Sequence, residues 1–306
     1  MITELREKIS ETFLGKEEVV ENVLICMLTG GHILLEDVPG VGKTTLVRTI
    51  ASLLDCDFGR IQFTPDTLPG DIVGISIYNM KTGEFNYRPG AIMHQIILAD
   101  EINRTSPKTQ ASLLEAMAEG QVTVDGTVYP LPQPFVVLAT QNPMDCLGTY
   151  PLPEAQLDRF MMRLVIGYPD HDSELKMARN YLDGKMEQTV KPMLEAKDLL
   201  RMREEVKEIY VKDNILQYAR DIIALTRTCD KLVMGASPRA YLALVSAARG
   251  KAYIERRDYV IPDDIKAVAG NVLHHRLALT AEAKIQGEKI DRLLTELVLK
   301  TKVPME

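Results

Sequence analysis

The sequence predicts an α/β fold, in which a parallel sheet covered by helices is followed by an all-helical second domain. In the first half, short apolar runs alternate with helix-like segments, an order typical of a parallel sheet with helices on both faces. Beyond Asp170, the apolar residues of Ser173–Leu299 recur mostly with a helical period. Two short segments in this half fit helix starts: Ser237-Pro238 as N-cap and first residue, and Pro262-Asp263-Asp264 as an acidic first turn.

Four apolar runs are the candidate strands of the sheet: His32–Glu36, Ile96–Ala99, Phe135–Thr140 and Met162–Ile166. Helical spacing follows the first run at Thr44–Leu54 and the second at Lys108–Glu119. Ligands of such sheets bind beyond the carboxyl ends of the strands. We therefore expect the loops after Glu36, Ala99 and Thr140 to converge on one site.

Two segments between the candidate strands alternate in hairpin fashion. Ile75–Tyr87 alternates around a Lys81-Thr82-Gly83 turn, and Gln121–Leu131 alternates around Asp125-Gly126, a strong two-residue hairpin signal. Either the two hairpins merely extend the sheet, or they are separate elements that move.

The bulk composition indicates an ordinary globular chain. The 306 residues carry a net charge of −7, which gives no global attraction to nucleic acid or anionic lipid. The four cysteines and five histidines show no zinc-ligand spacing, so reduced thiols are expected. No apolar run approaches the roughly 20 residues that cross a bilayer, and the charged N-terminus lacks a signal-peptide centre. We expect a cytoplasmic protein without membrane insertion.

The stretch LLEDVPGVGKTTL after the first strand has the character of a phosphate-binding loop. Gly40 and Gly42 allow close backbone approach at a helix start, where N–H groups and the helix dipole favour anions. Lys43 can reach the β- and γ-phosphates, and the Thr44 hydroxyl can bind Mg²⁺. Asp37 stands where the general pattern has its first glycine, and we expect it to be tolerated because Asp visits left-handed geometry.

Further polar residues at strand ends complete a nucleotide site. Asp100 and Glu101 follow the run IILA, where Asp100 would hold the Mg²⁺ shell and Glu101 would polarise the attacking water. Asn142 follows FVVLAT, where its amide either orients that water or serves as a turn residue before a proline. Arg159 and Arg239 are candidates for neutralising phosphate charge, with surface ion pairing as the alternative.

With these pieces in order, the sequence resembles the AAA+ ATPases and, within them, the MoxR family. The resemblance rests on HILLEDVPGVGKTTL, RPGAIMHQIILADEINRTSPKTQASLLEAM, GQVTVDG, ATQNP, PEAQLDRF and SPRAYLAL. In this family the loop commonly reads E-[DG]-x-P-G-x-G-K-T, so Asp37 is a family variation. The resemblance implies a P-loop αβα sandwich over residues 1–168 and a helical lid over 169–306. It also implies a helix-2 insert hairpin at about 72–90 and a pre-sensor hairpin at about 120–134.

The resemblance also implies roles for matching residues. It assigns nucleotide contacts to Gly15, Lys16, Pro39, Gly40, Val41, Gly42, Lys43, Thr44, Thr45 and Arg239. It assigns Mg²⁺ to Thr44 and Asp100, and catalytic roles to Lys43, Glu101, Asn142, Arg159 and Arg239. Asn142 corresponds to sensor 1, Arg159 to an arginine finger offered to a neighbouring subunit, and Arg239 to sensor 2 acting in cis or in trans. Arg104 and Arg163 match family positions without an assigned role.

The function implied by the resemblance is ATP binding and hydrolysis to ADP with Mg²⁺ at the subunit interfaces of a ring, expected to be a hexamer. Hydrolysis would drive chaperone-like remodelling of protein clients, together with a partner that carries a von Willebrand factor A (VWA) domain. A nucleic-acid motor is an alternative, since helix-2 inserts also occur in replicative helicases, but the acidic charge counts against it. A nucleotide-gated scaffold with little turnover is another, against which the presence of Glu101 and Arg159 counts.

Overall fold

The computed structural model describes residues 1–38, 40–142, 148–183 and 190–304. The chain divides into two compact units whose segments are interleaved along the sequence. Unit 1 comprises Met1–Glu21, His32–Leu152 and Val165–Leu200, and unit 2 comprises Asn22–Gly31, Pro153–Leu164 and Arg201–Glu306. The division into residues 1–168 and 169–306 stays a prediction, because the two compact units have other boundaries.

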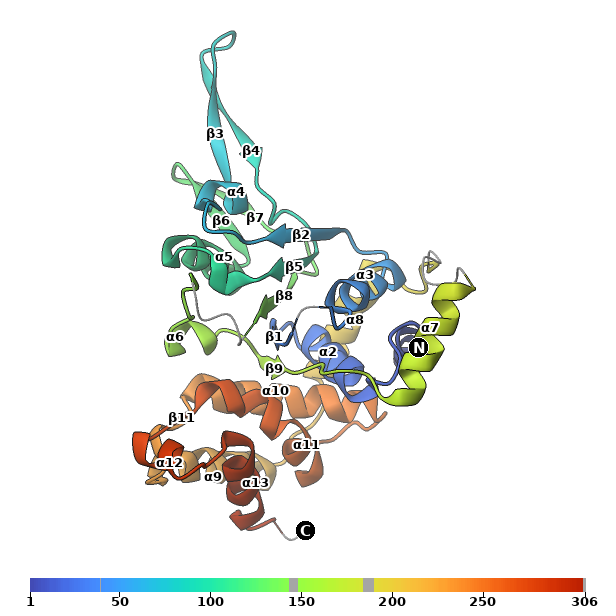
Figure 1. The fold of residues 1–306 in the computed structure, drawn as a ribbon, viewed down its shortest axis with the longest axis vertical. Coiled ribbons are helices and arrows are strands. Elements are labelled where there is room, and N and C mark those ends of the chain that lie inside the picture. Colours follow the sequence, from blue (N-terminus) through green and yellow to red (C-terminus); the bar gives the residue numbers. More distant parts are fainter. Residues whose placement is uncertain (39, 143–147, 184–189, 305–306) are drawn as a thin grey trace. The chain divides into compact units, whose positions relative to one another are not determined.

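A five-stranded sheet with the order β2-β5-β8-β1-β9 is the main sheet of the fold (Figure 1). Its strands are β1 (Ile33–Glu36), β2 (Phe58–Gln62), β5 (Ile96–Asp100), β8 (Val136–Gln141) and β9 (Met162–Leu164). The registers of β1 with β8, of β8 with β5 and of β5 with β2 are all parallel. The inner strands are continuous apolar runs, buried almost throughout, as a parallel sheet covered on both faces requires. The predicted parallel sheet is confirmed.

The register brings the polar strand ends to one edge of the sheet. Glu36 at the end of β1 pairs with Gln141 of β8, and Asp100 at the end of β5 pairs with Gln62 of β2. The predicted convergence of the strand-end loops follows from this parallel alignment.

The strand β2 is absent from the sequence prediction. It is short, and only Gly59 and Ile61 are buried while Arg60 and Gln62 are exposed. An edge strand with this alternation lacks the continuous apolar run that marks the inner strands.

The helical elements of unit 1 precede, separate and follow the strands of the sheet along the chain. They are α1 (Ile2–Thr12), α3 (Lys43–Leu53), α4 (Pro69–Val73), η1 (Ile102–Arg104), α5 (Pro107–Glu119) and α7 (His171–Leu182). The sequence explains both ends of α5. Ser106 caps its N-terminus by accepting the Thr109 N–H at 3.3 Å, Pro107 occupies the first helical position, and Gly120 ends it with φ +64°.

Both predicted hairpins form. β3 (Gly74–Asn79) pairs antiparallel with β4 (Glu84–Pro89), and β6 (Gln121–Val124) pairs antiparallel with β7 (Thr127–Pro130). The β3–β4 hairpin extends far from the sheet of unit 1 (Figure 1). The tight β6–β7 turn is made by Asp125 and Gly126, which both have positive φ, as the hairpin signal predicted.

Unit 2 is mainly helical, as predicted. Its elements are α6 (Glu154–Leu157), α9 (Asp213–Thr228), α10 (Pro238–Ile254), α11 (Pro262–Leu273), η2 (His274–Arg276), α12 (Ala281–Ile285) and α13 (Ile290–Lys300). α2 (Glu17–Leu28) and α8 (Ala196–Lys207) each have residues in both units. α10 and α11 begin at Pro238 and Pro262, as the sequence predicted.

One antiparallel pair interrupts the helices of unit 2. β10 (Leu232–Met234) pairs with β11 (Ala278–Leu279), a feature too short to leave a periodic signal in the sequence. None of the helices among the described residues combines the length and the apolar character needed to cross a bilayer.

Candidate functional site

The loop between β1 and α3 has the backbone geometry of a phosphate cradle. Gly40 and Gly42 both have φ +87°, a conformation open to glycine and strained for other residues. A Cβ at Gly40 would meet no atom within 4 Å, so this part of the loop is open to a ligand. Gly42 caps α3 and Lys43 is its first residue, which leaves the N–H groups of the first helical turn without partners inside the helix. Pro39 lies outside the described residues.

Asp37 ties the loop to the rest of unit 1. Its buried carboxylate accepts the Val38 N–H at 2.8 Å and the Gly167 N–H at 2.6 Å. Non-glycine residues with positive φ among those described are Asp55, Glu101, Asp125 and Arg256. Asp37 is not among them, so the left-handed geometry open to Asp is not used at this position, where the carboxylate holds the loop instead.

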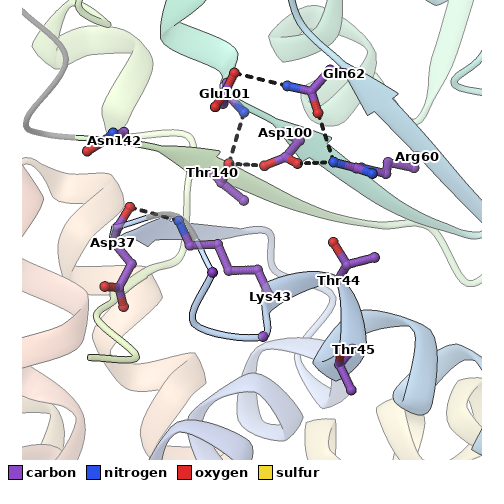
Figure 2. Close-up of a pocket in the computed structure, with 12 residues that line it drawn as sticks. Asp37, Lys43, Thr44, Thr45, Arg60, Gln62, Asp100, Glu101, Thr140 and Asn142 are labelled. Atoms are coloured by element: carbon purple, nitrogen blue, oxygen red, sulfur yellow. Dashed lines mark hydrogen bonds and ion pairs between the residues drawn. The ribbon is translucent and has the colours of Figure 1, made fainter. Parts of the chain in front are cut away.

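Across the pocket from Lys43 lie the acids at the end of β5 (Figure 2). The Thr140 hydroxyl of β8 donates to Asp100 Oδ1 at 2.6 Å and accepts the Glu101 N–H at 2.9 Å. Glu101 has φ +59° and ψ +48°, so its backbone leaves the strand direction immediately after Asp100. Left-handed geometry at a non-glycine residue is uncommon and clusters at functional sites. The Thr140 hydroxyl therefore holds both the carboxylate of Asp100 and the backbone of Glu101.

Side chains of β2 and η1 contact the carboxylate oxygens of these acids that do not contact the Thr140 hydroxyl. Arg60 Nη2 lies 2.7 Å from Asp100 Oδ2, and Gln62 Nε2 donates to Glu101 Oε2 at 3.0 Å. Arg104 Nη1 lies 3.1 Å from the same Glu101 oxygen. Arg60 and Gln62 were missed because β2 was missed. Their alternation with buried residues in FGRIQF was the signal that could have found them.

A pocket of about 400 Å³ opens between the loop and the strand ends. It is lined by Asp37, Gly40, Gly42, Lys43, Thr44, Thr45, Arg60, Gln62, Asp100, Glu101, Thr140 and Asn142. Lys43 Nζ donates to the Asp37 carbonyl at 2.8 Å and so keeps its ammonium group over the loop. Partial burial lowers the pKa of Lys43, and the negative charges of Asp37, Asp100 and Glu101 oppose that shift.

These residues fit a nucleotide and its metal ion. The open glycine loop and the Lys43 ammonium suit a polyphosphate. Among the residues with described positions, no three His, Cys, Asp or Glu side chains gather as a metal-binding group. The available donors are the Thr44 hydroxyl and the Asp100 carboxylate. Mg²⁺ is commonly bound by one or two such groups together with phosphate oxygens and water, so this donor set suits it.

The remaining predicted residues lie outside this pocket. Gly15 has φ +72°, and Lys16 Nζ donates to the Tyr168 carbonyl at 2.7 Å, both within unit 1. Arg159 follows α6 and Arg239 is the second residue of α10; both are exposed and belong to unit 2. The structure thus gathers the predicted loop, acid and amide residues in one place, and it places the two arginines in the other unit. Val41 is half-buried in the loop and is not part of the pocket lining.

Comparison with known proteins gives a consistent family. The model of the AAA domain, described as the ATPase family associated with various cellular activities, matches residues 32–162, and the AAA lid domain matches 224–297. The chain is 48% identical to the protein YeaC of Bacillus subtilis, over 98% of this chain and 94% of that protein. It is 42% identical to the chaperone MoxR1 of Mycobacterium tuberculosis, over 90% of this chain and 75% of that protein.

A solved structure extends the match to the whole fold. A crystal structure of a protein from Cytophaga hutchinsonii superimposes with a TM-score of 0.93 at 40% identity, over 99% of this chain and 95% of that one. The chain therefore belongs to the MoxR family of AAA ATPases and is a P-loop enzyme that binds nucleotide and hydrolyses ATP.

Proposed function

We propose that this ATPase works as a ring with Mg²⁺ and couples hydrolysis to the remodelling of protein partners. The observation that carries the proposal is the pocket in which Lys43 of the loop faces Asp100 and Glu101 at the end of β5. A phosphate chain held by the loop would bring its terminal phosphate towards these acids. Such juxtaposition is what phosphoryl transfer needs, because its catalysis depends mainly on positioning and charge stabilisation.

Several residues of the pocket have roles in this proposal. The loop amides and Lys43 would hold the phosphates, while Thr44 and Asp100 would hold Mg²⁺. When bound, the ion would supply positive charge against the phosphates. Glu101 accepts a proton from the attacking water, and Asn142 orients that water.

Glu101 has a restrained starting position. Its carboxylate accepts from Gln62 at 3.0 Å and pairs with Arg104 at 3.1 Å. Both contacts lie on the same carboxylate oxygen, Oε2, so their release would free that oxygen for the attacking water.

The exposed arginines of unit 2 are assigned to charge stabilisation. We assign Arg159 to the pocket of a neighbouring subunit and Arg239 to the nucleotide, in cis or in trans. A trans-acting arginine can contribute roughly 10³- to 10⁵-fold in rate. Hydrolysis would then depend on assembly of a ring, which we expect to be a hexamer. Gly15 and Lys16 are assigned to the adenine.

The remodelling role is supported by the relatives, among them a protein named chaperone MoxR1. The work would be done by movement of the helical unit and the hairpins with nucleotide state. A VWA-domain protein and protein clients are the proposed partners, in the cytoplasm.

Two variants test the proposal. Lys43→Ala should lose nucleotide binding in a fluorescent-ADP titration. Glu101→Gln should bind ATP like wild type and release phosphate roughly 10²- to 10⁴-fold more slowly, as loss of a general base predicts. Equal phosphate release by Glu101→Gln and wild type would remove Glu101 from the chemistry.

The ATP-trapped Glu101→Gln form also tests assembly and partners. Native mass spectrometry with ATP and Mg²⁺ should show a closed oligomer, and a pull-down should retain client and VWA partner. A monomer that hydrolyses ATP rapidly would exclude the trans-acting arginine. Steeply salt-dependent, DNA-stimulated turnover would favour a nucleic-acid motor instead.

A further inference from the structure

A single buried arginine organises the backbone around Arg159. Arg276, in η2, is 4% exposed and contacts the segment 158–161 within unit 2. Its Nε donates to Asp158 Oδ1 at 2.7 Å. Its Nη2 donates to the Phe160 carbonyl at 2.7 Å and to the Asp158 carbonyl at 3.3 Å. Its Nη1 donates to the Met161 carbonyl at 3.0 Å and to the Val272 carbonyl.

These contacts use every N–H of the guanidinium group, which has five donors in a fixed planar fork. Three of the acceptors are carbonyls of Asp158, Phe160 and Met161, on both sides of Arg159. A lysine has three donors on one atom and cannot reproduce this set. The side chain of Arg276 is therefore matched to one conformation of the segment.

The same cluster includes the start of helix α10. Asp158 Oδ2 accepts the Ser237 hydroxyl at 3.0 Å, and Ser237 Oγ accepts the Ala240 N–H at 3.1 Å as the helix N-cap. Arg239 is the second residue of this helix. One carboxylate thus joins the segment that carries Arg159 to the helix that carries Arg239.

Stability alone is a weak explanation for this arrangement. Burial lowers the pKa of Arg276, which the Asp158 carboxylate opposes, so keeping the guanidinium charged here is costly. Buried ion pairs are often no better for stability than apolar residues of the same size. What the cluster does provide is a defined backbone geometry next to an exposed arginine.

We propose that Arg276 is a positioning residue, which sets the backbone on both sides of Arg159 and, through Asp158, fixes it relative to Arg239. The proposal rests on the proposed function, in which Arg159 acts on the nucleotide of a neighbouring subunit. Through Arg159, Arg276 then acts on the pocket of the neighbour, and no residue of this cluster lines the pocket of its own chain.

Arg276→Lys is the first test, because it keeps a buried positive charge and removes the fork. We expect the dissociation constant of a fluorescent ATP analogue to be unchanged and kcat to fall by roughly 10²-fold, the effect of misplacing a catalytic group by about 1 Å. The matched control is Arg292→Lys, at a 79% exposed side chain in the same unit, which should keep wild-type kcat. Wild-type kcat in folded Arg276→Lys would overturn the proposal.

Subunit mixing separates positioning from a general structural defect. Lys43→Ala subunits have no working pocket but offer an intact Arg159, so mixing them with Arg276→Lys subunits should restore turnover in the Arg276→Lys pockets. Mixing Arg276→Lys subunits with Arg159→Ala subunits should not restore turnover. If Lys43→Ala rescues Arg159→Ala but fails to rescue Arg276→Lys, the positioning role is wrong.

The same experiment distinguishes this inference from the proposed function beneath it. If Lys43→Ala cannot rescue even Arg159→Ala, the trans-acting arginine itself is wrong, and the role given to Arg276 is overturned with it. If circular dichroism shows that Arg276→Lys is unfolded, Asp158→Asn takes its place in the mixing experiment. This substitution removes the shared charge with little change in shape.

Discussion

The rings of Tyr87 and Tyr129 stack face to face, with centroids 3.9 Å apart and an angle of 16° between their planes. Tyr87 belongs to β4 and Tyr129 to β7, so this contact joins the two hairpins of unit 1. The Tyr87 hydroxyl donates to the Val73 carbonyl at 2.7 Å, and partial burial raises the pKa of that hydroxyl. The two hairpins are therefore in direct contact through their side chains.

Removal of this stack should loosen both hairpins together. Stacked aromatic pairs contribute about 0.5–1.5 kcal/mol beyond their buried area, so Tyr129→Ala should raise amide exchange in β3–β4 and β6–β7 by roughly two- to tenfold. Tyr129→Phe keeps the ring and should exchange like wild type. Hydrogen-exchange mass spectrometry measures the effect, and unchanged exchange in β3–β4 would show that the hairpins are independent.

Restoring the general glycine pattern at the loop should weaken the protein. Asp37→Gly removes the acceptor of the Gly167 N–H and the Val38 N–H, and each lost hydrogen bond to a buried charge is worth roughly 1–3 kcal/mol. We expect a lower melting temperature in a thermal-shift assay. Asp37→Asn keeps one oxygen acceptor, so its melting temperature should lie between those of wild type and Asp37→Gly. A melting temperature for Asp37→Gly at or above wild type would contradict the anchoring role of this carboxylate.

Acid should destabilise unit 2 through His275. Its Nε2 lies 3.0 Å from the Phe160 carbonyl and must donate to it, while Nδ1 is buried and has no hydrogen-bond partner among the described residues. Burial and the neighbouring Arg276 hold the pKa of His275 well below its ordinary value of 6.5.

The sign of the pH effect follows from this depressed pKa. The unfolded chain takes up a proton as pH falls through about 6.5, whereas the folded chain does not until lower pH, so the stability contributed by neutral His275 declines below that point. Wild type should lose more melting temperature than His275→Gln between pH 7.5 and pH 5.5. His171→Gln, at an exposed site, should behave like wild type. Parallel pH profiles for wild type and His275→Gln would refute the prediction.

The metal requirement should report on Arg60. Its guanidinium lies 2.7 Å from Oδ2 of the Asp100 carboxylate, which we assign to Mg²⁺, so the two cations would compete for one carboxylate. A half-exposed ion pair is worth about 0.2–1 kcal/mol, hence Arg60→Ala should lower the Mg²⁺ concentration for half-maximal hydrolysis by up to roughly fivefold. Arg60→Lys keeps the charge and should change this Mg²⁺ concentration less. A higher Mg²⁺ requirement would mean that Arg60 orients Asp100 for the metal.

The sequence predicted the parts of the fold that rest on local signals. β1, β5 and β8 are continuous buried apolar runs, and α3 follows a glycine loop that is recognisable by composition alone. The β6–β7 turn was predictable because both positions of a two-residue hairpin turn need positive φ, which Asp and Gly adopt readily. These features need no knowledge of distant contacts.

The parts that could not be predicted depend on contacts far apart in the chain. Asp37 was expected to be tolerated because Asp can adopt left-handed geometry, yet its carboxylate accepts an N–H 130 residues further on. Arg60 and Gln62 reach Asp100 and Glu101 only because β2 pairs with β5. No local pattern carries that information, since it arises from the register of the sheet.

The interleaving of the two units constrains how the chain is made. The chain passes from one unit to the other five times, and unit 2 needs Asn22–Gly31 from near its beginning. Within that segment Met27 accepts a hydrogen bond from Arg203, and Ile25 lies against Gly250. During translation, the apolar helix α2 leaves the ribosome long before α10 has been synthesised, so its partners are missing for most of the time that the protein takes to be made. The apolar face of α2 therefore stays without its partners in unit 2 until the last third of the chain has emerged.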